Sequence, residues 1–175
     1  EQIRHNQLIT PLLDAAVAMQ ADYLIWVTSN TTATLMQWNG GAYAGFSRVE
    51  PWLPVDKSCR RVNVEAQVRE PDSLLALYRR LLRLRKEKPA LQVGDYRPLP
   101  WADMGVFAYF REAEGTRLAV FLNFTNRPFP LNARAARIEG GPWKIILSTY
   151  PGKEGGFLAK DILLDPGEAV IMEEV

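Results

Sequence analysis

The feature that most constrains the fold is a change of hydrophobic periodicity at Gly94. Before it, residues 73–88 repeat leucine at helical spacing, and Pro89 ends the pattern. After it, the apolar residues alternate with polar ones or form short runs, and Gly, Pro and Asn turns separate the runs. The runs are 106–111, 118–124, 143–149 and 169–172. The pattern predicts a helical part followed by a small antiparallel β domain.

The first part of the chain carries shorter signals and a long irregular stretch. Residues 8–20 have the spacing of a short helix, and the β-branched and aromatic run 23–28 predicts a buried strand. From 31 to 68 the periodicity fades, and we expect a long loop that is rich in aromatic residues. These are Trp38, Tyr43, Phe46 and Trp52. Long loops are often functional, which suggests binding. Aromatic side chains dominate packing energetics everywhere, so from the residues alone we favour the interpretation that the rings pack the loop onto a neighbouring surface, with binding as the alternative.

Charge and the scarcity of Cys and His exclude several kinds of site. The 175 residues carry 21 Lys plus Arg against 20 Asp plus Glu, so no strong field gathers nucleic acid. Cys59 is the single cysteine, which fits a reducing, cytoplasmic compartment, and His5 is the single histidine. No apolar stretch reaches the ~20 residues of a membrane span. We therefore expect no nucleic acid or membrane partner, and neither a metal site nor a cofactor.

An ordered series of motifs runs from residue 36 to about residue 124. It consists of Met36-Gln37-Trp38-Asn39, Ala44-Gly45-Phe46-Ser47, Pro51-Trp52-Leu53-Pro54-Val55, Val62-Asn63-Val64-Glu65, Pro71-x-Ser73-Leu74-Leu75, Leu84-Arg85-x-x-x-Pro89-Ala90-Leu91-x-x-Gly94, Val106-Phe107-Ala108-Tyr109 and Leu122-Asn123-Phe124. Together these motifs resemble the C-terminal part of the α-amylase family of glycoside hydrolases, in its α-glucosidase and oligo-1,6-glucosidase branch.

The resemblance implies an α+β chain with two domains. Residues 1–91 would be the remnant of a (β/α)8 barrel end, in which 36–70 are similar to the loop after the eighth strand and 73–88 to the last helix. Residues 1–32 match no family motif that we identify. Residues 92–175 would form an antiparallel β-sandwich C-terminal domain. Since barrel active sites are built from the loops at the C-terminal ends of the strands, the resemblance assigns the aromatic loop to sugar binding.

The resemblance also implies which residues meet the substrate. The expected substrate-binding residues are Gln37, Trp38, Asn39, Tyr43 and Phe46, and the expected partners are α-glucosides or maltooligosaccharides. The family's usual Arg-Thr-Pro-Met-Gln-Trp-Asp reads here as Ala33-Thr34-Leu35-Met36-Gln37-Trp38-Asn39. A basic residue that commonly faces the sugar is therefore Ala33, and the terminal carboxylate is an amide.

No catalytic residue is expected in this chain. The family's chemistry needs three carboxylates, two of them ~5–5.5 Å apart in a retaining glycosidase, and the resemblance implies that they come from strands upstream of the loop. The acidic residues before Met36 are Glu1, Asp14 and Asp22, and none has a family-like context. We expect part of an α-glucosidase-like enzyme of carbohydrate metabolism that is inactive alone, because a complete barrel takes ~250 residues.

One alternative is a stand-alone, non-catalytic β-sandwich module for carbohydrate binding or protein association. A further expectation concerns the leucine-rich face of the 73–88 helix, which resembles a surface that packs on a barrel. Exposed apolar patches of that kind are rare on monomers. We expect residues 1–32 to cover this face, or two copies of the chain to cover one another as a homodimer.

Overall fold

The computed structural model describes residues 35–99, 105–131, 141–156 and 162–175. The predicted helix at 8–20 and the predicted strand at 23–28 lie outside these ranges. The described residues up to Arg80 belong to one compact unit, and those from Leu81 onward belong to a second.

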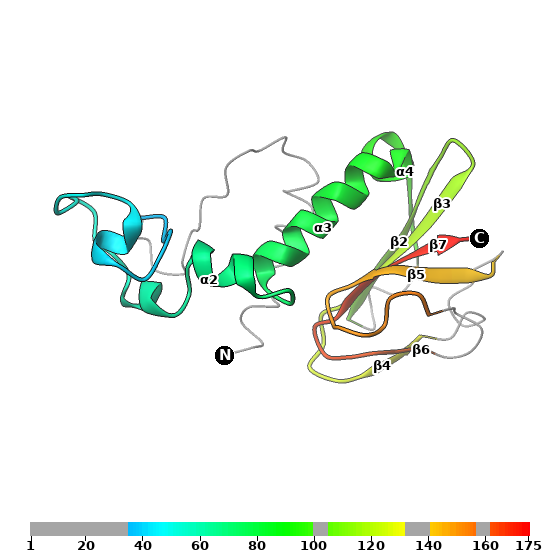
Figure 1. The fold of residues 1–175 in the computed structure, drawn as a ribbon. Coiled ribbons are helices and arrows are strands. Elements are labelled where there is room, and N and C mark those ends of the chain that lie inside the picture. The colour runs from blue at the N-terminus through cyan, green and yellow to red at the C-terminus, as the bar shows by residue number, and fades with distance from the viewer. Residues whose placement is uncertain (1–34, 100–104, 132–140, 157–161) are drawn as a thin grey trace. The chain divides into compact units, whose positions relative to one another are not determined.

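Three short helices occupy the stretch that the sequence predicted as a long loop. They are η1 (Ala42–Gly45), η2 (Lys57–Arg60) and α2 (Val64–Arg69) (Figure 1). The expectation of a loop without its own secondary structure is therefore wrong for these residues. Side chains cap two of the helices: Asp56 accepts from the Ser58 amide at 2.7 Å, and Asn63 accepts from the Ala66 amide at 2.8 Å. Helices of four to six residues are too short to leave a periodic signal.

The predicted helix at 73–88 is confirmed as α3 (Leu74–Glu87). The Ser73 hydroxyl begins it, accepting from the Ala76 amide at 3.1 Å and donating to the Gln67 carbonyl at 2.7 Å. Pro89 ends it as predicted and opens a further short helix, α4 (Pro89–Val93). Within the described ranges, no helix combines the length and the apolarity that crossing a bilayer requires.

The described residues after Gly94 form seven strands. They are β1 (Asp95–Pro98), β2 (Val106–Ala113), β3 (Thr116–Asn123), β4 (Phe129–Leu131), β5 (Trp143–Ser148), β6 (Ile162–Leu164) and β7 (Ala169–Glu174). Five strands build an antiparallel sheet in the order β1-β2-β3-β7-β5, and β4 pairs with β6 in a separate two-stranded sheet (Figure 1). The four predicted runs are confirmed as β2, β3, β5 and β7. The strands β1, β4 and β6 were not predicted, because three or four residues do not establish an alternating pattern.

A tight turn fixes the register of the central hairpin. Glu114 and Gly115 both have positive φ, at 50° and 73°, as a two-residue hairpin turn requires. Ala113 consequently pairs with Thr116, and the register runs without a break to the pair Val106 and Asn123.

The five-stranded sheet buries side chains on both faces, which explains the nearly continuous apolar run of β3. On one face, side chains of the large sheet pack with Leu131 of β4 and Leu164 of β6 in one hydrophobic core. On the other face, Leu118 of β3 packs with Ala90 and Leu91 of α4. The other members of the first core are Val106, Ala108, Phe110, Ala119, Phe121, Trp143, Ile145, Val170 and Met172.

Candidate functional site

The aromatic loop, residues 38–52, starts with a closed turn. The Trp38 and Asn39 amides both donate to the Ala44 carbonyl, at 2.8 and 3.1 Å. The Ala44 amide in turn donates to the Gly41 carbonyl at 3.1 Å. One turn, residues 38–46, therefore carries three of the four aromatic residues that the sequence singled out.

The backbone of this turn is left-handed over three consecutive residues. Tyr43 has φ 51° and ψ 30°, Ala44 has φ 56° and ψ 25°, and Gly45 has φ 67°. Residues with a Cβ atom pay about 1–2 kcal/mol each for this conformation. Such backbone persists where the surrounding structure imposes it, and it is often found at functional sites.

The side chain of Asn39 lies in the centre of the turn. Its Oδ1 accepts from the Gly41 amide at 2.9 Å, which is the local bond typical of an Asx turn. A Cβ atom placed on Gly45 would lie 2.4 Å from Asn39 Nδ2, so the amide group rests directly against the Gly45 backbone. Gly45 is needed for two reasons, its positive φ and this close approach.

The start of the turn is attached to the first residues of α2. The Gln37 carbonyl accepts from the Val64 amide at 2.9 Å, and the Trp38 carbonyl accepts from the Glu65 amide at 3.0 Å. The first amides of a helix have no partner inside the helix. The turn satisfies two of those of α2, and this holds residues 37 and 38 against a regular element.

The four aromatic side chains of the loop are open to solvent. Trp38 is 50% exposed, Tyr43 36%, Phe46 49% and Trp52 90%. Aromatic side chains contribute most to stability when they are buried, so a group of exposed rings on one loop is available for contact with a partner of some kind. Exposed rings of this kind are compatible both with binding a ligand and with packing against a neighbouring surface.

The two amide side chains among the expected substrate-binding residues differ from the rings. The side-chain amide of Gln37 lies 3.4 Å from the Ser58 hydroxyl oxygen. The Asn39 side chain accepts a hydrogen bond from the Gly41 amide inside the turn. The structure thus brings Gln37, Trp38, Asn39, Tyr43 and Phe46 into one turn and its base, with the rings open and the amides engaged. Direct contact of these five residues with a sugar stays a prediction.

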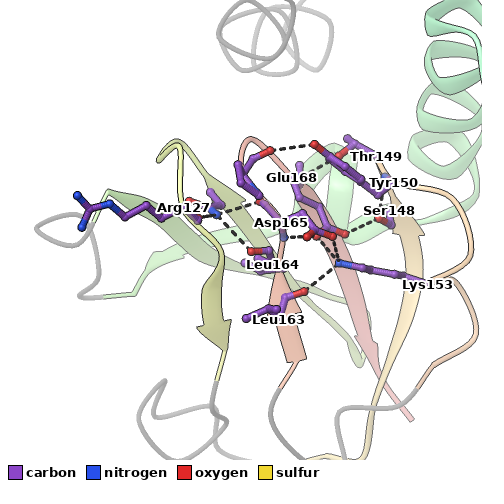
Figure 2. Close-up of polar contacts among 12 residues, drawn as sticks. Arg127, Ser148, Thr149, Tyr150, Lys153, Leu163, Leu164, Asp165 and Glu168 are labelled. Atoms are coloured by element: carbon purple, nitrogen blue, oxygen red, sulfur yellow. Dashed lines mark hydrogen bonds and ion pairs between the residues drawn. The ribbon is translucent and has the colours of Figure 1, made fainter. Parts of the chain in front are cut away.

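A second polar cluster, formed by Ser148, Lys153, Asp165 and Glu168, was not found from the sequence (Figure 2). Lys153 Nζ donates to Glu168 Oε2 at 2.6 Å and to Asp165 Oδ2 at 2.8 Å. Glu168 also accepts from the Ser148 hydroxyl at 2.8 Å and from the Asp165 amide at 2.6 Å. The turn signal Asp165-Pro166-Gly167 marked this stretch of the chain, but nothing local pointed to a partner at residue 153.

Burial and charge determine what this cluster can do. The side chain of Glu168 is fully buried, and both its oxygens are engaged. Partial burial acts to lower the pKa of Lys153, but the hydrogen bonds and negative charges of Asp165 and Glu168 outweigh it and hold the pKa above its usual value. The lysine therefore stays protonated between the two carboxylates. The cluster is a structural ion network and not an acid and base pair open to a substrate.

No three side chains of His, Cys, Asp or Glu within the described ranges gather in an arrangement that could hold a metal ion.

Two buried polar atoms among the described residues, Tyr78 Oη and Trp143 Nε1, have no hydrogen-bond partner. Burial raises the pKa of Tyr78.

Comparison with known proteins relates the chain to glucosidases and to other carbohydrate-active enzymes. The family model of the alpha-amylase catalytic domain matches residues 15–94. The match therefore includes part of the segment 1–32, in which we identify no family motif.

Two curated relatives illustrate the similarity in sequence. An oligo-1,6-glucosidase of Bacillus sp. (strain F5) is 41% identical over 87 residues, which are 50% of this chain and 17% of the relative. A glucan 1,6-alpha-glucosidase of Streptococcus pneumoniae is 34% identical over 140 residues, which are 80% of this chain and 24% of the relative. The chain spans about a quarter or less of the length of the curated relatives that it matches.

Solved structures show the same likeness in three dimensions. An isomaltulose synthase of Klebsiella sp. LX3 matches with a TM-score of 0.71 and 28% identity, over 80% of this chain and 24% of the other. A trehalose-6-phosphate hydrolase of Bacillus licheniformis matches with a TM-score of 0.67 and 29% identity, over 79% of this chain and 25% of the other. Over the matched residues, the chain is similar to glycoside hydrolases of the α-amylase family.

Proposed function

We propose that this chain is the part of an α-glucosidase-type glycoside hydrolase that carries an aromatic contact surface for α-glucosides. The observation that carries the proposal is the set of open rings at Trp38, Tyr43 and Phe46 on one hydrogen-bonded turn. The relatives named for acting on 1,6-linked glucosides support α-linked glucose oligosaccharides as the class of ligand.

The chemistry of the rings suits such a ligand. The C–H-rich face of a glucose ring is apolar and flat, so it can stack on an aromatic side chain and bury area on both partners. Because hydrogen bonds already hold the turn, binding a ligand there costs little conformational entropy. The attachment of residues 37 and 38 to α2 therefore adds to the binding free energy that stacking on the rings provides.

We also propose that the chain does not catalyse hydrolysis by itself. A retaining glycosidase needs a nucleophile and an acid that both reach the glycosidic bond. Asp165 and Glu168 lie near one another, but Lys153 bridges them and Glu168 is buried, which argues against their use as such a pair. In the same proposal, the five-stranded and two-stranded sheets form a small β-sandwich that follows the barrel-like part.

The binding proposal is tested by titrating the full chain with isomaltotriose and maltotriose while following tryptophan fluorescence. We expect a saturable change, weakened about two- to tenfold by Phe46→Ala, which removes a stacking ring. Phe124→Ala is the matched control, because Phe124 is 45% exposed against 49% for Phe46 but lies outside the loop. An equal effect of both variants, or no saturable change at millimolar sugar, would contradict the proposal.

The catalytic part is tested by incubating the chain with an aryl α-glucoside. We expect no turnover above the rate in buffer. Sustained release of the aryl group that disappears when one carboxylate of the chain is replaced would show that the chain carries its own catalytic residues.

A further inference from the structure

We propose that Asn39 is a positioning residue: its amide group locks the left-handed turn that presents Trp38, Tyr43 and Phe46, and it does not itself bind the sugar. This inference rests on the proposed function for its consequence in binding. The locking itself concerns the chain alone and can be tested without a ligand.

The first argument is the engagement of the Asn39 side chain. Its Oδ1 accepts from the Gly41 amide at 2.9 Å, and the amide group contacts the backbone of Gly45 closely. A Cβ atom on Gly41 would also lie 3.1 Å from Asn39 Oδ1. The side chain therefore occupies the space between two glycines of the same turn, and turning it toward a ligand would empty that space.

The second argument is the cost of the backbone that it supports. Tyr43 and Ala44 both adopt the left-handed conformation with a Cβ atom, and this does not persist without compensation. Two hydrogen bonds in the turn offset the cost of this backbone: the Trp38 and Asn39 amides both donate to the Ala44 carbonyl. Asn39 thus contributes a main-chain and a side-chain hydrogen bond to the same nine-residue turn, residues 38–46.

The third argument is the position of the rings relative to this contact. Trp38 precedes Asn39 directly, Tyr43 is the first left-handed residue, and Phe46 donates its amide to the Tyr43 carbonyl at 3.0 Å. The backbone directions of all three depend on the turn remaining closed. Removing the Asn39 side chain is therefore expected to affect all three rings at once. If Asn39 instead contacted the sugar directly, its removal would eliminate one contact and leave the rings in place.

The first test needs no sugar and measures amide hydrogen exchange in the full chain. Asn39→Ala is expected to speed exchange at Gly41 and Ala44 by about tenfold or more, because the side-chain acceptor is gone and the turn opens more often. Asn39→Asp keeps an oxygen acceptor for the Gly41 amide and is expected to restore most of the protection. Unchanged exchange in Asn39→Ala would overturn the proposal.

The second test uses Gly45→Ala in two backgrounds. In the wild type, Gly45→Ala has two costs: the new methyl group clashes with the Asn39 amide, and alanine is strained at a positive φ. In the Asn39→Ala background only the cost of the positive φ remains. We expect the two substitutions to be non-additive in amide exchange, with Gly45→Ala doing less damage once Asn39 is alanine. Strictly additive effects would show that the two residues are not coupled.

The third test adds isomaltotriose and separates this inference from the proposed function. A positioning role predicts about three- to tenfold weaker binding in Asn39→Ala, with recovery in Asn39→Asp and a parallel loss of protection. Weaker binding with normal exchange would make Asn39 a direct ligand and refute the positioning role. Absence of binding in every variant, with the exchange changes present, would refute the proposed function and leave the lock established.

Discussion

Replacing Glu168 is the perturbation whose size the structure determines best. The carboxylate is buried and accepts hydrogen bonds from Lys153, Ser148 and the Asp165 amide, at 2.6, 2.8 and 2.6 Å. Removing one partner of a buried ion pair costs about 3–5 kcal/mol. Lys153 retains Asp165 and some exposure to water, which reduces the loss, whereas two further donors lose their acceptor. We therefore expect Glu168→Ala to lower the free energy of unfolding by about 3–5 kcal/mol.

Glu168→Gln separates the charge from the shape. Glutamine can keep one oxygen toward Lys153 and the Asp165 amide and turn its NH2 group to the Ser148 oxygen, so it should cost less, about 1–3 kcal/mol. The sign should change when Lys153 is first replaced by methionine. In that background the carboxylate is a buried charge without its lysine partner, and Glu168→Gln should be neutral or stabilising.

The assay is urea unfolding of all variants followed by far-UV circular dichroism, with a check that the slope against urea is unchanged. Asp95→Asn is the control, because Asp95 is an exposed carboxylate on the edge strand β1 and should change stability by less than about 0.5 kcal/mol. An equal cost of Glu168→Gln with and without Lys153 would refute the reasoning, since it would mean that the two charges are not coupled.

Three further predictions follow from buried or capping groups. Asn123→Ala should cost about 2–4 kcal/mol, because the Asn123 side chain donates to the carbonyls of Arg127 and Asp165, at 2.8 and 2.9 Å, and urea unfolding measures it. Ser73→Ala should cost about 1 kcal/mol and increase amide exchange in the first turn of α3, whereas Ser73→Thr should retain the cap. The pKa values of Tyr78 and Lys153 are both raised in the folded state, so the stability they contribute is present below their unfolded pKa values and is lost as the pH rises through the folded ones. Urea midpoints that stay constant from about pH 9 to about pH 12 would contradict this sign.

The regular elements were predictable where their pattern is local and long. The leucines of α3 repeat over fourteen residues between a cap and a proline, and β2 and β3 alternate or run apolar for eight residues each around a Glu-Gly turn. The short helices η1 and α2 and the three-residue strand β4 depend on single side chains or on a partner strand. Periodicity cannot reveal them, because each contains at most one or two repeats of its own period.

The candidate site was predictable in its members and not in their arrangement. The order of motifs identified Gln37, Trp38, Asn39, Tyr43 and Phe46. Whether a side chain is open or engaged depends on the path of the backbone, and here Asn39 is folded into a left-handed turn while Trp38 and Phe46 remain open. A left-handed turn at a tyrosine and an alanine runs against local preference, so local rules would not have proposed it.

The amino-acid sequence by itself determined the helix α3, its end before Pro89 and the long strands of the sheet, since each depends on a pattern of neighbouring residues. The order of motifs along the chain also showed the resemblance to the α-amylase family. What the tertiary structure alone decided was which distant groups meet. Lys153 reaches Glu168 across fifteen positions, and Asn123 reaches Asp165 across forty-two. These interactions matter because a charge or an amide that is removed from water costs free energy unless it forms hydrogen bonds within the fold.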